Sequence, residues 1–307
     1  VGTPLSDLEA VLAEKGQCLP FEPPHFGPGA TVGGMVAAGL SGPARASVGA
    51  VRDYLLGVVL INGRAEVLTF GGQVMKNVAG YDVSRLMAGA WGTLGLLTEV
   101  SLKVLPVAPA EATLRFECNQ ADALRKLHAW GGQPLPLNAS CWVEDAGVGQ
   151  LYVRLRGAVA AVDAACKSMG GTRLDNATAA PDWQACREQT LPWFAARLAR
   201  PGQALWRLSL PATAPVLALP GGVSPLVEWH GALRWVQAPL AHGDVLREAA
   251  RAVGGSASLF IADGAGGERA GGQLDLKSAA LEQIHARLKH SFDPAGIFNP
   301  GRMAPQW

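Results

Sequence analysis

The feature that most constrains this chain is a glycine-rich stretch near its beginning, Gly29-Ala-Thr-Val-Gly-Gly34. Glycine tolerates positive φ angles and has no Cβ atom, so a second backbone or a ligand can come close to it. A diphosphate is held best by converging backbone N–H groups, and no Lys or Arg lies between His25 and Arg45. The stretch therefore predicts either an anion site built from amides or a tightly packed glycine turn, and these residues alone leave both open.

The best-known nucleotide-binding motifs are absent from the sequence. No phosphate loop ends in Gly-Lys-Ser/Thr, and no G-x-G-x-x-G follows an expected strand. A mononucleotide P-loop and an NAD-binding Rossmann fold are therefore disfavoured.

Composition excludes several further classes. The 307 residues carry 26 Lys and Arg against 25 Asp and Glu, which leaves no basic signal for nucleic acid. The chain does not open with a cationic and apolar leader, which predicts a cytoplasmic location. No Cys-x-x-Cys pair occurs, so we expect reduced core thiols instead of disulfides or a metal cluster, at Cys18, Cys118, Cys141, Cys166 and Cys186.

Hydrophobic patterns change near Pro106 and Pro109. Before this point they predict a helix over 5–15, a helical turn over 35–40, a β-hairpin around Asn62-Gly63, a helix over 83–90 and a strand over 94–104. After it, alternating strands and helices predict an α+β domain with an antiparallel sheet. The expected strands cover 112–116, 140–143, 151–155, 205–210, 233–236 and 258–261, and the helices cover 121–130, 158–169, 192–198, 245–253 and 279–292.

Four motifs occur in an order that resembles the vanillyl-alcohol-oxidase-like, or PCMH-type, flavoproteins. They are the Gly29–Gly34 stretch, Lys76-Asn-Val-Ala-Gly-Tyr-Asp-Val83, Gly92-Thr-Leu-Gly-Leu-Leu-Thr-Glu99 and Asp293-Pro-Ala-Gly-Ile-Phe-Asn-Pro-Gly-Arg302. The segments 19–25 and 71–82 are most specifically similar to the FAD-binding E subunits of glycolate oxidase (glycolate dehydrogenase).

The resemblance implies an α+β fold in three parts. It places part of a PCMH-type FAD-binding domain at 1–107, an α+β cap domain at 108–284, and a C-terminal helix and tail that return to the FAD domain at 285–307. The chain opens with Val1-Gly-Thr-Pro, which matches the middle of the family's FAD domain. We therefore expect the N-terminal part of that domain to be missing from this sequence.

The resemblance also implies residues that contact FAD. Those at the diphosphate are Thr31, Val32, Gly33 and Gly34, those along the ribityl or flavin side are Ser41 and Gly42, those at the adenosine end are Gly95 and Leu96, and those at the isoalloxazine are Asn299 and Arg302. A second group, Asn77, Tyr81 and Asp82, either touches the flavin or holds its supporting loops. Met35 departs from the family, in which many members have Asn at this position.

No catalytic residue and no metal site is predicted. His285 and His290 are five residues apart and do not form a metal-binding pair on one helical face. Ala241-His-Gly-Asp244 resembles the start of a metal-binding motif that the resemblance assigns to a separate catalytic subunit of such complexes, but the rest of that motif is absent. We expect His242 to start a helix and His25 to be structural, although His25 is the one histidine with a candidate redox role. The tryptophans on apolar strands are predicted to lie in the core or in an interface, at positions Trp206, Trp229 and Trp235.

The implied function is that of the FAD-binding subunit of a glycolate oxidase complex, which converts glycolate to glyoxylate. Its expected partners are a sister FAD-containing catalytic subunit and an iron–sulfur subunit that passes electrons to quinone, with membrane contact only through the complex at the inner face. Two alternatives stay open: a stand-alone FAD-dependent dehydrogenase for D-lactate or another 2-hydroxy acid, and a flavin-free scaffold subunit. The sequence does not decide whether this chain itself oxidises the substrate.

Overall fold

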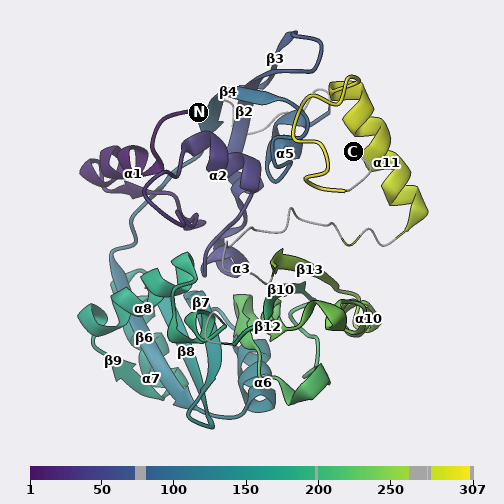
Figure 1. Ribbon diagram of the computed structural model, residues 1–307. Helices are drawn as coiled ribbons and strands as arrows, with labels where there is room; N and C mark the ends of the chain where they lie inside the picture. Colours follow the sequence, from purple (N-terminus) through teal and green to yellow (C-terminus); the bar gives the residue numbers. More distant parts are fainter. Residues whose placement is uncertain (73–80, 198–199, 263–274, 276–277, 305–307) are drawn as a thin grey trace. The chain divides into compact units, whose positions relative to one another are not determined.

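The computed structural model describes residues 1–72, 81–197, 200–262, 275 and 278–304, which belong to two compact units (Figure 1). Unit 1 comprises Val1–Gly42, Gly49–Val107 and Leu276–Trp307, and unit 2 comprises Pro43–Val48 and Ala108–Asp275. The chain leaves unit 1 after Val107, the residue that also ends the expected FAD domain. It returns at Leu276, nine residues before the expected tail at 285, and the short segment Pro43–Val48 belongs to unit 2, which the sequence did not predict.

A three-stranded antiparallel sheet forms the centre of unit 1, in the order β3 (Val67–Gly71), β2 (Leu55–Ile61) and β4 (Leu96–Leu102). The predicted hairpin between β2 and β3 is confirmed. Its loop is held by Asn62, whose carboxamide oxygen accepts hydrogen bonds from the amides of Arg64 and Glu66. Asn62 is therefore buried in a five-residue loop, in place of the two-residue turn that Asn-Gly alone suggests.

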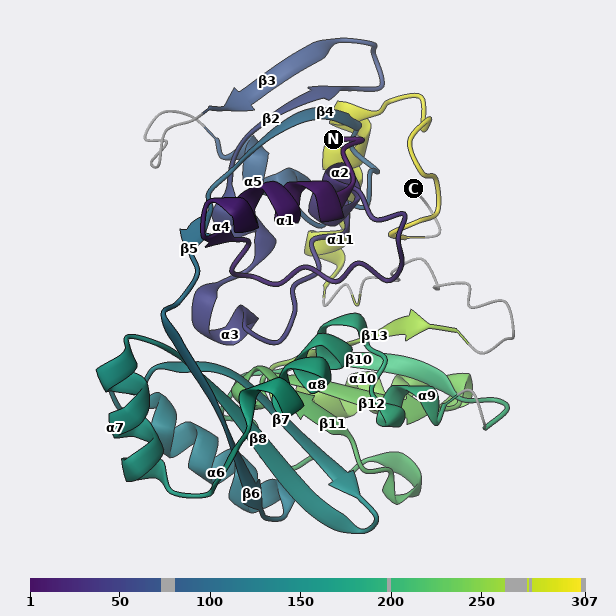
Figure 2. The ribbon, with the colours of Figure 1, turned by 90° about the vertical axis from the view of Figure 1, so that its left-hand side faces the viewer.

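The helices of unit 1 are short except at the two ends of the chain. Figure 2 shows α1, α2, α4 and α5 on one side of the three-stranded sheet. The predicted first and last helices are confirmed, and α2 begins at residue 32 instead of 35 because Thr31 caps it. The elements are α1 (Leu5–Glu14), α2 (Val32–Ala38), α4 (Val51–Tyr54), α5 (Val83–Met87) and α11 (Ala279–Phe292), together with the strand pair β1 (Gln17–Cys18) and β5 (Leu105–Pro106).

Unit 2 is built on an eight-stranded antiparallel sheet in the order β13-β10-β12-β11-β7-β8-β6-β9. This confirms the predicted α+β domain with an antiparallel sheet. The strands are β6 (Ala110–Glu117), β7 (Leu137–Asp145), β8 (Val148–Gly157), β9 (Thr172–Leu174), β10 (Ala204–Ser209), β11 (Leu226–Glu228), β12 (Leu233–Ala238) and β13 (Ser256–Ile261). The helices are α3 (Arg45–Val48), α6 (Gln120–Gly131), α7 (Val159–Met169), α8 (Asn176–Glu188), α9 (Pro192–Ala195) and α10 (Gly243–Ala252).

The two faces of this sheet differ in chemistry. Alternation along each strand places residues such as Leu114, Val153 and Trp206 on one face, where they pack against α6, α7 and α10. The opposite face carries Arg207 and Trp235, which are cross-strand partners. Helices α8 and α9 contact this second face: Trp183 of α8 donates a hydrogen bond to the Thr113 hydroxyl, and Phe194 of α9 packs against Trp235.

The cysteines of the chain are free thiols with different degrees of burial. Cys141 and Cys186 are buried as expected, whereas Cys18, Cys118 and Cys166 are only partly buried, so the expectation of core thiols is wrong for these three. No helix in the described ranges combines the length and the apolar content needed to cross a bilayer.

Candidate functional site

A cavity of about 290 Å³ in unit 1 brings together residues from distant parts of the sequence. Gly34, Ala37 and Ala38 form one wall, where the small side chains of α2 leave room. Trp91 lines another part, and the Arg302 guanidinium lies 4.9 Å from the centre of its ring. The remaining lining residue is Asn299, so three of the predicted FAD-contacting residues, Gly34, Asn299 and Arg302, meet here.

The tail that carries Asn299 and Arg302 is fixed to the rest of unit 1. The Asn299 side-chain amide donates a hydrogen bond of 2.8 Å to the Trp91 carbonyl oxygen. Asn299 itself has a φ of 43°, a left-handed conformation that Asn tolerates better than most residues. The cavity wall is therefore assembled by a specific contact between the tail and the Trp91 backbone.

A buried ion pair anchors the start of the tail. Lys289 Nζ lies 2.6 Å from Asp293 Oδ2 and donates two further hydrogen bonds of 2.8 Å to the carbonyl oxygens of Thr93 and Phe298. Both side chains are almost inaccessible, with 7% and 0% exposed. Burial alone would raise the pKa of Asp293, but the hydrogen bonds from Lys289 and from the amides of Phe298 and Ile297 outweigh it and lower that pKa.

The beginning of α2 differs from the prediction. The amides of Val32 and Gly33 donate to the carbonyl oxygens of Thr3 and Val1, at 3.0 and 2.8 Å, and the Gly34 amide donates to the Thr31 hydroxyl at 3.1 Å. In this structure these three amides therefore donate to acceptors inside the chain, whereas the resemblance implies that they face a diphosphate. A Cβ atom on Gly33 would lie 2.6 Å from the Val1 Cβ, so this glycine is needed for chain packing. These contacts fit the second reading of the stretch, a tightly packed glycine turn.

Ser41 and Gly42, which the resemblance places along the ribityl or flavin side, form hydrogen bonds with neighbouring backbone groups. Ser41 Oγ accepts a hydrogen bond of 3.3 Å from the Val51 amide, and the Gly42 amide donates to the Phe21 carbonyl oxygen at 2.9 Å. Neither residue lines the cavity beside Arg302.

The residues expected at the adenosine end and near the flavin motif also lie apart from this cavity. A Cβ on Gly95 would come within 2.7 Å of the Ile61 carbonyl oxygen, and Leu96 begins β4 with its side chain largely exposed. Asp82 caps α5 by accepting from the Arg85 amide at 3.1 Å, which is a supporting contact of the kind that the sequence allowed. Tyr81 is 95% exposed, and Asn77 lies outside the described residues.

The histidines of the described residues have structural contacts. His25 Nε2 lies 3.0 Å from Glu9 Oε2, which ties its loop to α1, and His242 directly precedes α10 as expected. His285 and His290 lie on α11. Within the ranges given above, no three His, Cys, Asp or Glu side chains are placed to hold a metal ion.

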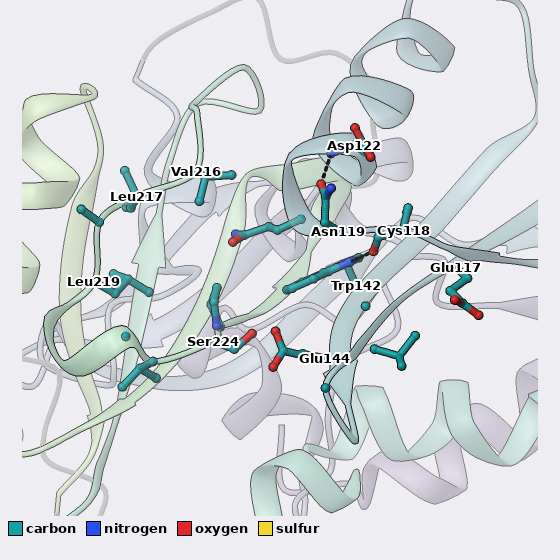
Figure 3. A pocket seen from close by; sticks show the side chains of 18 residues that line it. Glu117, Cys118, Asn119, Asp122, Trp142, Glu144, Val216, Leu217, Leu219 and Ser224 are labelled. Carbon is teal, nitrogen blue, oxygen red and sulfur yellow. Dashed lines mark hydrogen bonds between the residues drawn. The ribbon is translucent and has the colours of Figure 1, made fainter.

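A groove of about 840 Å³ in unit 2 contains none of the predicted site residues (Figure 3). Trp142 forms part of it and donates from Nε1 to the Cys118 carbonyl oxygen at 2.9 Å. Asn119 points to the first turn of α6, where it caps the Asp122 amide. Carboxylates of Glu117, Asp122 and Glu144 line this groove, so its charge disfavours a small anionic acid.

The sequence reasoning missed a polar cluster on unit 2. Arg45 and Arg207 both lie against the ring of Trp229, at 4.4 and 5.1 Å from its centre, and Glu228 and His230 flank that tryptophan along the chain. A signal for it exists in the sequence: Arg207 interrupts the mostly apolar run 204–208, and Glu228 directly follows the apolar pair Leu226-Val227. The prediction that Trp206, Trp229 and Trp235 are buried is confirmed, but Trp229 has this additional role as a platform for two cations.

Residues 1–71 match the FAD binding domain family. The fold resembles that of alkyldihydroxyacetonephosphate synthase, with a TM-score of 0.64 and 17% identity, over 96% of this chain and 62% of that one. The predicted α+β fold with a PCMH-type FAD-binding domain is thus confirmed.

The particular family follows from a closer relative. The chain is 47% identical over 303 residues to glycolate oxidase subunit GlcE of Escherichia coli K12, which covers 99% of this chain and 80% of that protein. The chain belongs to the glycolate oxidase subunit GlcE family. Glycolate oxidase subunit GlcD of Bacillus subtilis is 32% identical over 117 residues, or 38% of this chain and 25% of that protein. A mitochondrial D-lactate dehydrogenase of Arabidopsis thaliana is 36% identical over 98 residues, or 32% and 17% of the two chains.

A testable consequence concerns the close approach of the backbone at Gly39, the residue after α2, to the backbone at Gly89. Gly39, with a φ of 61°, ends α2, and a Cβ at this position would lie 2.7 Å from the Gly89 Cα. We expect Gly39→Ala to lower the free energy of unfolding by about 2–4 kcal/mol, because the left-handed strain and the backbone clash add. The matched control is Gly16→Ala, since Gly16 has a φ of 64° and nothing within 4 Å of its Cβ position. Urea denaturation of both variants separates the cost of the left-handed backbone from the cost of the clash. Equal losses of unfolding free energy in the two variants would contradict the clash.

Proposed function

We propose that this chain is the FAD-binding subunit of a glycolate oxidase complex. The reaction removes two electrons and two protons from glycolate and yields glyoxylate. The observation that carries the proposal is the 47% identity to the E. coli GlcE subunit along nearly the whole chain. The match of residues 1–71 to the FAD binding domain family supports the choice of cofactor.

The cavity beside α2 fits part of such a cofactor. Gly34, Ala37 and Ala38 leave an uncluttered helix surface, and Trp91 offers a flat apolar one. Arg302 adds a permanent positive charge, which would stabilise negative charge on a bound ring system. FAD, when bound, supplies the hydride-accepting and electron-relaying chemistry. We propose Gly34, Asn299 and Arg302 as cofactor-contacting residues of this chain.

For the other residues that the resemblance places at FAD, we propose roles that support the cofactor site. Ser41, Gly42, Asp82 and Gly95 hold loops and strand ends. The segment from Thr31 to Gly33 caps and packs α2 in this structure, so it would contact a diphosphate only through exchange of its present hydrogen-bond partners.

The proposed partners follow from the subunit names of the relatives. A GlcD-type flavoprotein subunit is the proposed sister chain. An iron–sulfur subunit that leads to quinone is proposed as the next carrier on the family resemblance of the sequence motifs alone. We propose that the chain works on the cytoplasmic side and meets the membrane only through this complex.

The flavin-free scaffold remains a second candidate because of one specific observation. The amides of Val32, Gly33 and Gly34 already have acceptors inside the chain. A stand-alone dehydrogenase of the D-lactate type is supported less, because the D-lactate dehydrogenase of Arabidopsis matches only 32% of this chain.

The decisive experiment uses the subunit purified together with its sister subunits. We expect the subunit to release FAD on denaturation, and Arg302→Met to lower its FAD content by about tenfold, because a charged contact is lost. Arg85→Met is the matched control, since Arg85 is an exposed arginine of unit 1 paired with Asp82. A folded wild-type subunit without FAD would overturn the cofactor role and favour the scaffold. Absence of glycolate-dependent dye reduction by the complex would overturn the proposal that glycolate is the substrate.

A further inference from the structure

A cavity of about 470 Å³ lies in unit 2, between the second face of the sheet and the helices α8 and α9. The strands β7 and β8 contribute Val143 and Tyr152 to its lining, and the two helices contribute Trp183 and Trp193. Its volume falls within the range of small-molecule sites in proteins. All of its described lining residues belong to unit 2, so it shares none with the cavity beside Arg302.

The helices that cover this cavity are fixed to the sheet by contacts of their own. On α8, Trp183 Nε1 donates a hydrogen bond of 2.9 Å to the Thr113 hydroxyl. On α9, the centre of the Phe194 ring lies 5.8 Å from that of Trp235. The cavity therefore exists before any ligand arrives, and a preformed site avoids the entropic cost of ordering its walls.

The inner lining of the cavity is apolar and closed to solvent. Leu226 and Ala179 are 0% and 3% exposed, and Cys141 and Cys186 contribute buried thiols. A hydrogen bond with Cys141 and burial raise the pKa of Cys186, so its thiol stays uncharged near pH 7. This part of the cavity favours an uncharged, apolar part of a ligand, because binding removes apolar surface from water.

Two half-buried aromatic side chains, Tyr152 and Trp193, also line the cavity. Trp183 differs from them, since the Arg154 guanidinium already lies 4.9 Å from the centre of its ring. Among the described residues, no cation is stacked on Tyr152 or Trp193. The faces of such rings attract an ammonium group, so these two side chains are the candidates for contact with a cationic ligand.

Carboxylates line the opening of the cavity. Glu144 and Asp145 end β7, Asp182 lies on α8, and all three side chains are exposed. In the ranges that the structure describes, none of the three takes part in an ion pair. The described lining contains no Lys, Arg or His. The opening therefore attracts a cation and repels an anion.

One arginine lies near this opening without lining the cavity. Arg115 is the cross-strand partner of Tyr152. Burial raises the pKa of Tyr152, the charge of Arg115 lowers it, and the charges of Asp182 and Asp145 raise it. The Tyr152 hydroxyl therefore stays protonated near pH 7 and can donate or accept a hydrogen bond. Arg115 offsets part of the negative charge that the carboxylates bring to the opening.

We propose that this cavity binds a small organic amine with a flat apolar body. The body lies against the apolar lining, Tyr152 and Trp193, and the ammonium group faces the carboxylates of Glu144, Asp145 and Asp182. An acid of the same shape would meet like charges at the opening, and an uncharged analogue would lack the attraction. The amine site is independent of the proposed oxidation of glycolate.

Probes of one shape and different charge test the site: 2-phenylethylamine, 2-phenylethanol and 3-phenylpropionate. Each is titrated into the purified full chain by calorimetry near pH 7, where the amine is charged. We expect the amine to bind about tenfold more tightly than the alcohol, and the acid to bind more weakly than both. Higher salt should narrow the difference, since salt screens exposed charges. Equal affinities for the amine and the alcohol, or no binding of the amine, overturn the proposal.

Substitutions at the opening test where the amine binds. Glu144→Gln combined with Asp182→Asn should weaken amine binding by about tenfold and leave alcohol binding within about twofold. Arg115→Gln should strengthen amine binding by about twofold, because it removes the opposing charge. Glu248→Gln is the matched control, since Glu248 is an exposed carboxylate on α10 of unit 2, outside the described lining.

Trp193→Leu tests the aromatic contact and should weaken amine binding by about fivefold. Circular dichroism and thermal unfolding identify a variant that fails to fold. The carboxylate variants then carry the comparison, because their side chains are exposed. Amine affinity that is unchanged in the folded double variant, or that Glu248→Gln reduces equally, overturns the site. A loss confined to the lining variants supports it, whether or not the purified chain holds FAD.

Discussion

Exchange of Lys289 for methionine is expected to lower the free energy of unfolding by about 3–5 kcal/mol. The substitution leaves Asp293 as a buried charge without its ammonium partner and removes donors from the carbonyl oxygens of Thr93 and Phe298. It also frees the tail that carries Asn299 and Arg302, so we expect FAD content to fall with stability. Urea denaturation and the FAD released from the purified subunit measure the two effects.

The control for Lys289→Met is an exposed pair in the same unit. Arg85 and Asp82 are about half exposed, and Arg85→Met is expected to cost less than about 1 kcal/mol. The double variant Lys289→Met with Asp293→Asn should lose clearly less than the sum of the two single variants, because the second substitution removes the orphaned charge. Additive losses would show that the pair is not coupled and would contradict this account of the tail.

The same ion pair predicts the pH dependence of stability. The pKa of Asp293 is lower in the folded chain than in the unfolded one, so the unfolded state binds the proton more readily. Its contribution is fully present above the unfolded value of about 4, and it is lost as the pH falls through the folded pKa. We therefore expect the stability difference between wild type and Asp293→Asn to shrink on acidification below about pH 4, which denaturation at a series of pH values measures.

The tail illustrates what the sequence could and could not predict. The motif from Asp293 to Arg302 resembles a family pattern that places Asn299 and Arg302 at the isoalloxazine. In the structure both residues line one cavity together with Gly34, which the sequence analysis assigned to the diphosphate. The hydrogen bonds that Lys289 makes were not predicted. The Thr93 carbonyl oxygen that it reaches lies 196 residues away, and a backbone oxygen is not visible in a sequence pattern. The engagement of the Val32 and Gly33 amides by Thr3 and Val1 was hidden for the same reason.

The strands show the limits of local patterns. β6 alternates apolar and polar residues along its eight residues, β8 does so over most of its length, and the centres of both strands were predicted. β9 and β11 have three residues each, too few for a period of two to be recognised, and their existence depends on the neighbouring strands. α8 was missed because Pro181 lies inside it, a residue that normally argues against a helix interior.

Exchange of Glu228 for leucine is expected to destabilise unit 2 by about 3–5 kcal/mol. Glu228 is 4% exposed, and both carboxylate oxygens accept hydrogen bonds, from Cys186 Sγ at 3.0 Å and Trp235 Nε1 at 2.6 Å. A hydrogen bond with Cys141, burial and the charge of Glu228 raise the pKa of Cys186, so its thiol stays protonated and remains a donor. Leucine would leave two buried donors without an acceptor and Arg207 without the opposing charge.

The matched control is Glu111→Leu, because Glu111 accepts from Arg156 Nε at 2.6 Å in a pair that is about a quarter exposed. Its loss should cost less than about 1 kcal/mol, since water replaces the partner. Glu228→Gln should fall between the two, because it keeps one carbonyl acceptor and removes the charge. Equal destabilisation by Glu228→Leu and Glu111→Leu would show that the buried carboxylate does not hold this face of the sheet together.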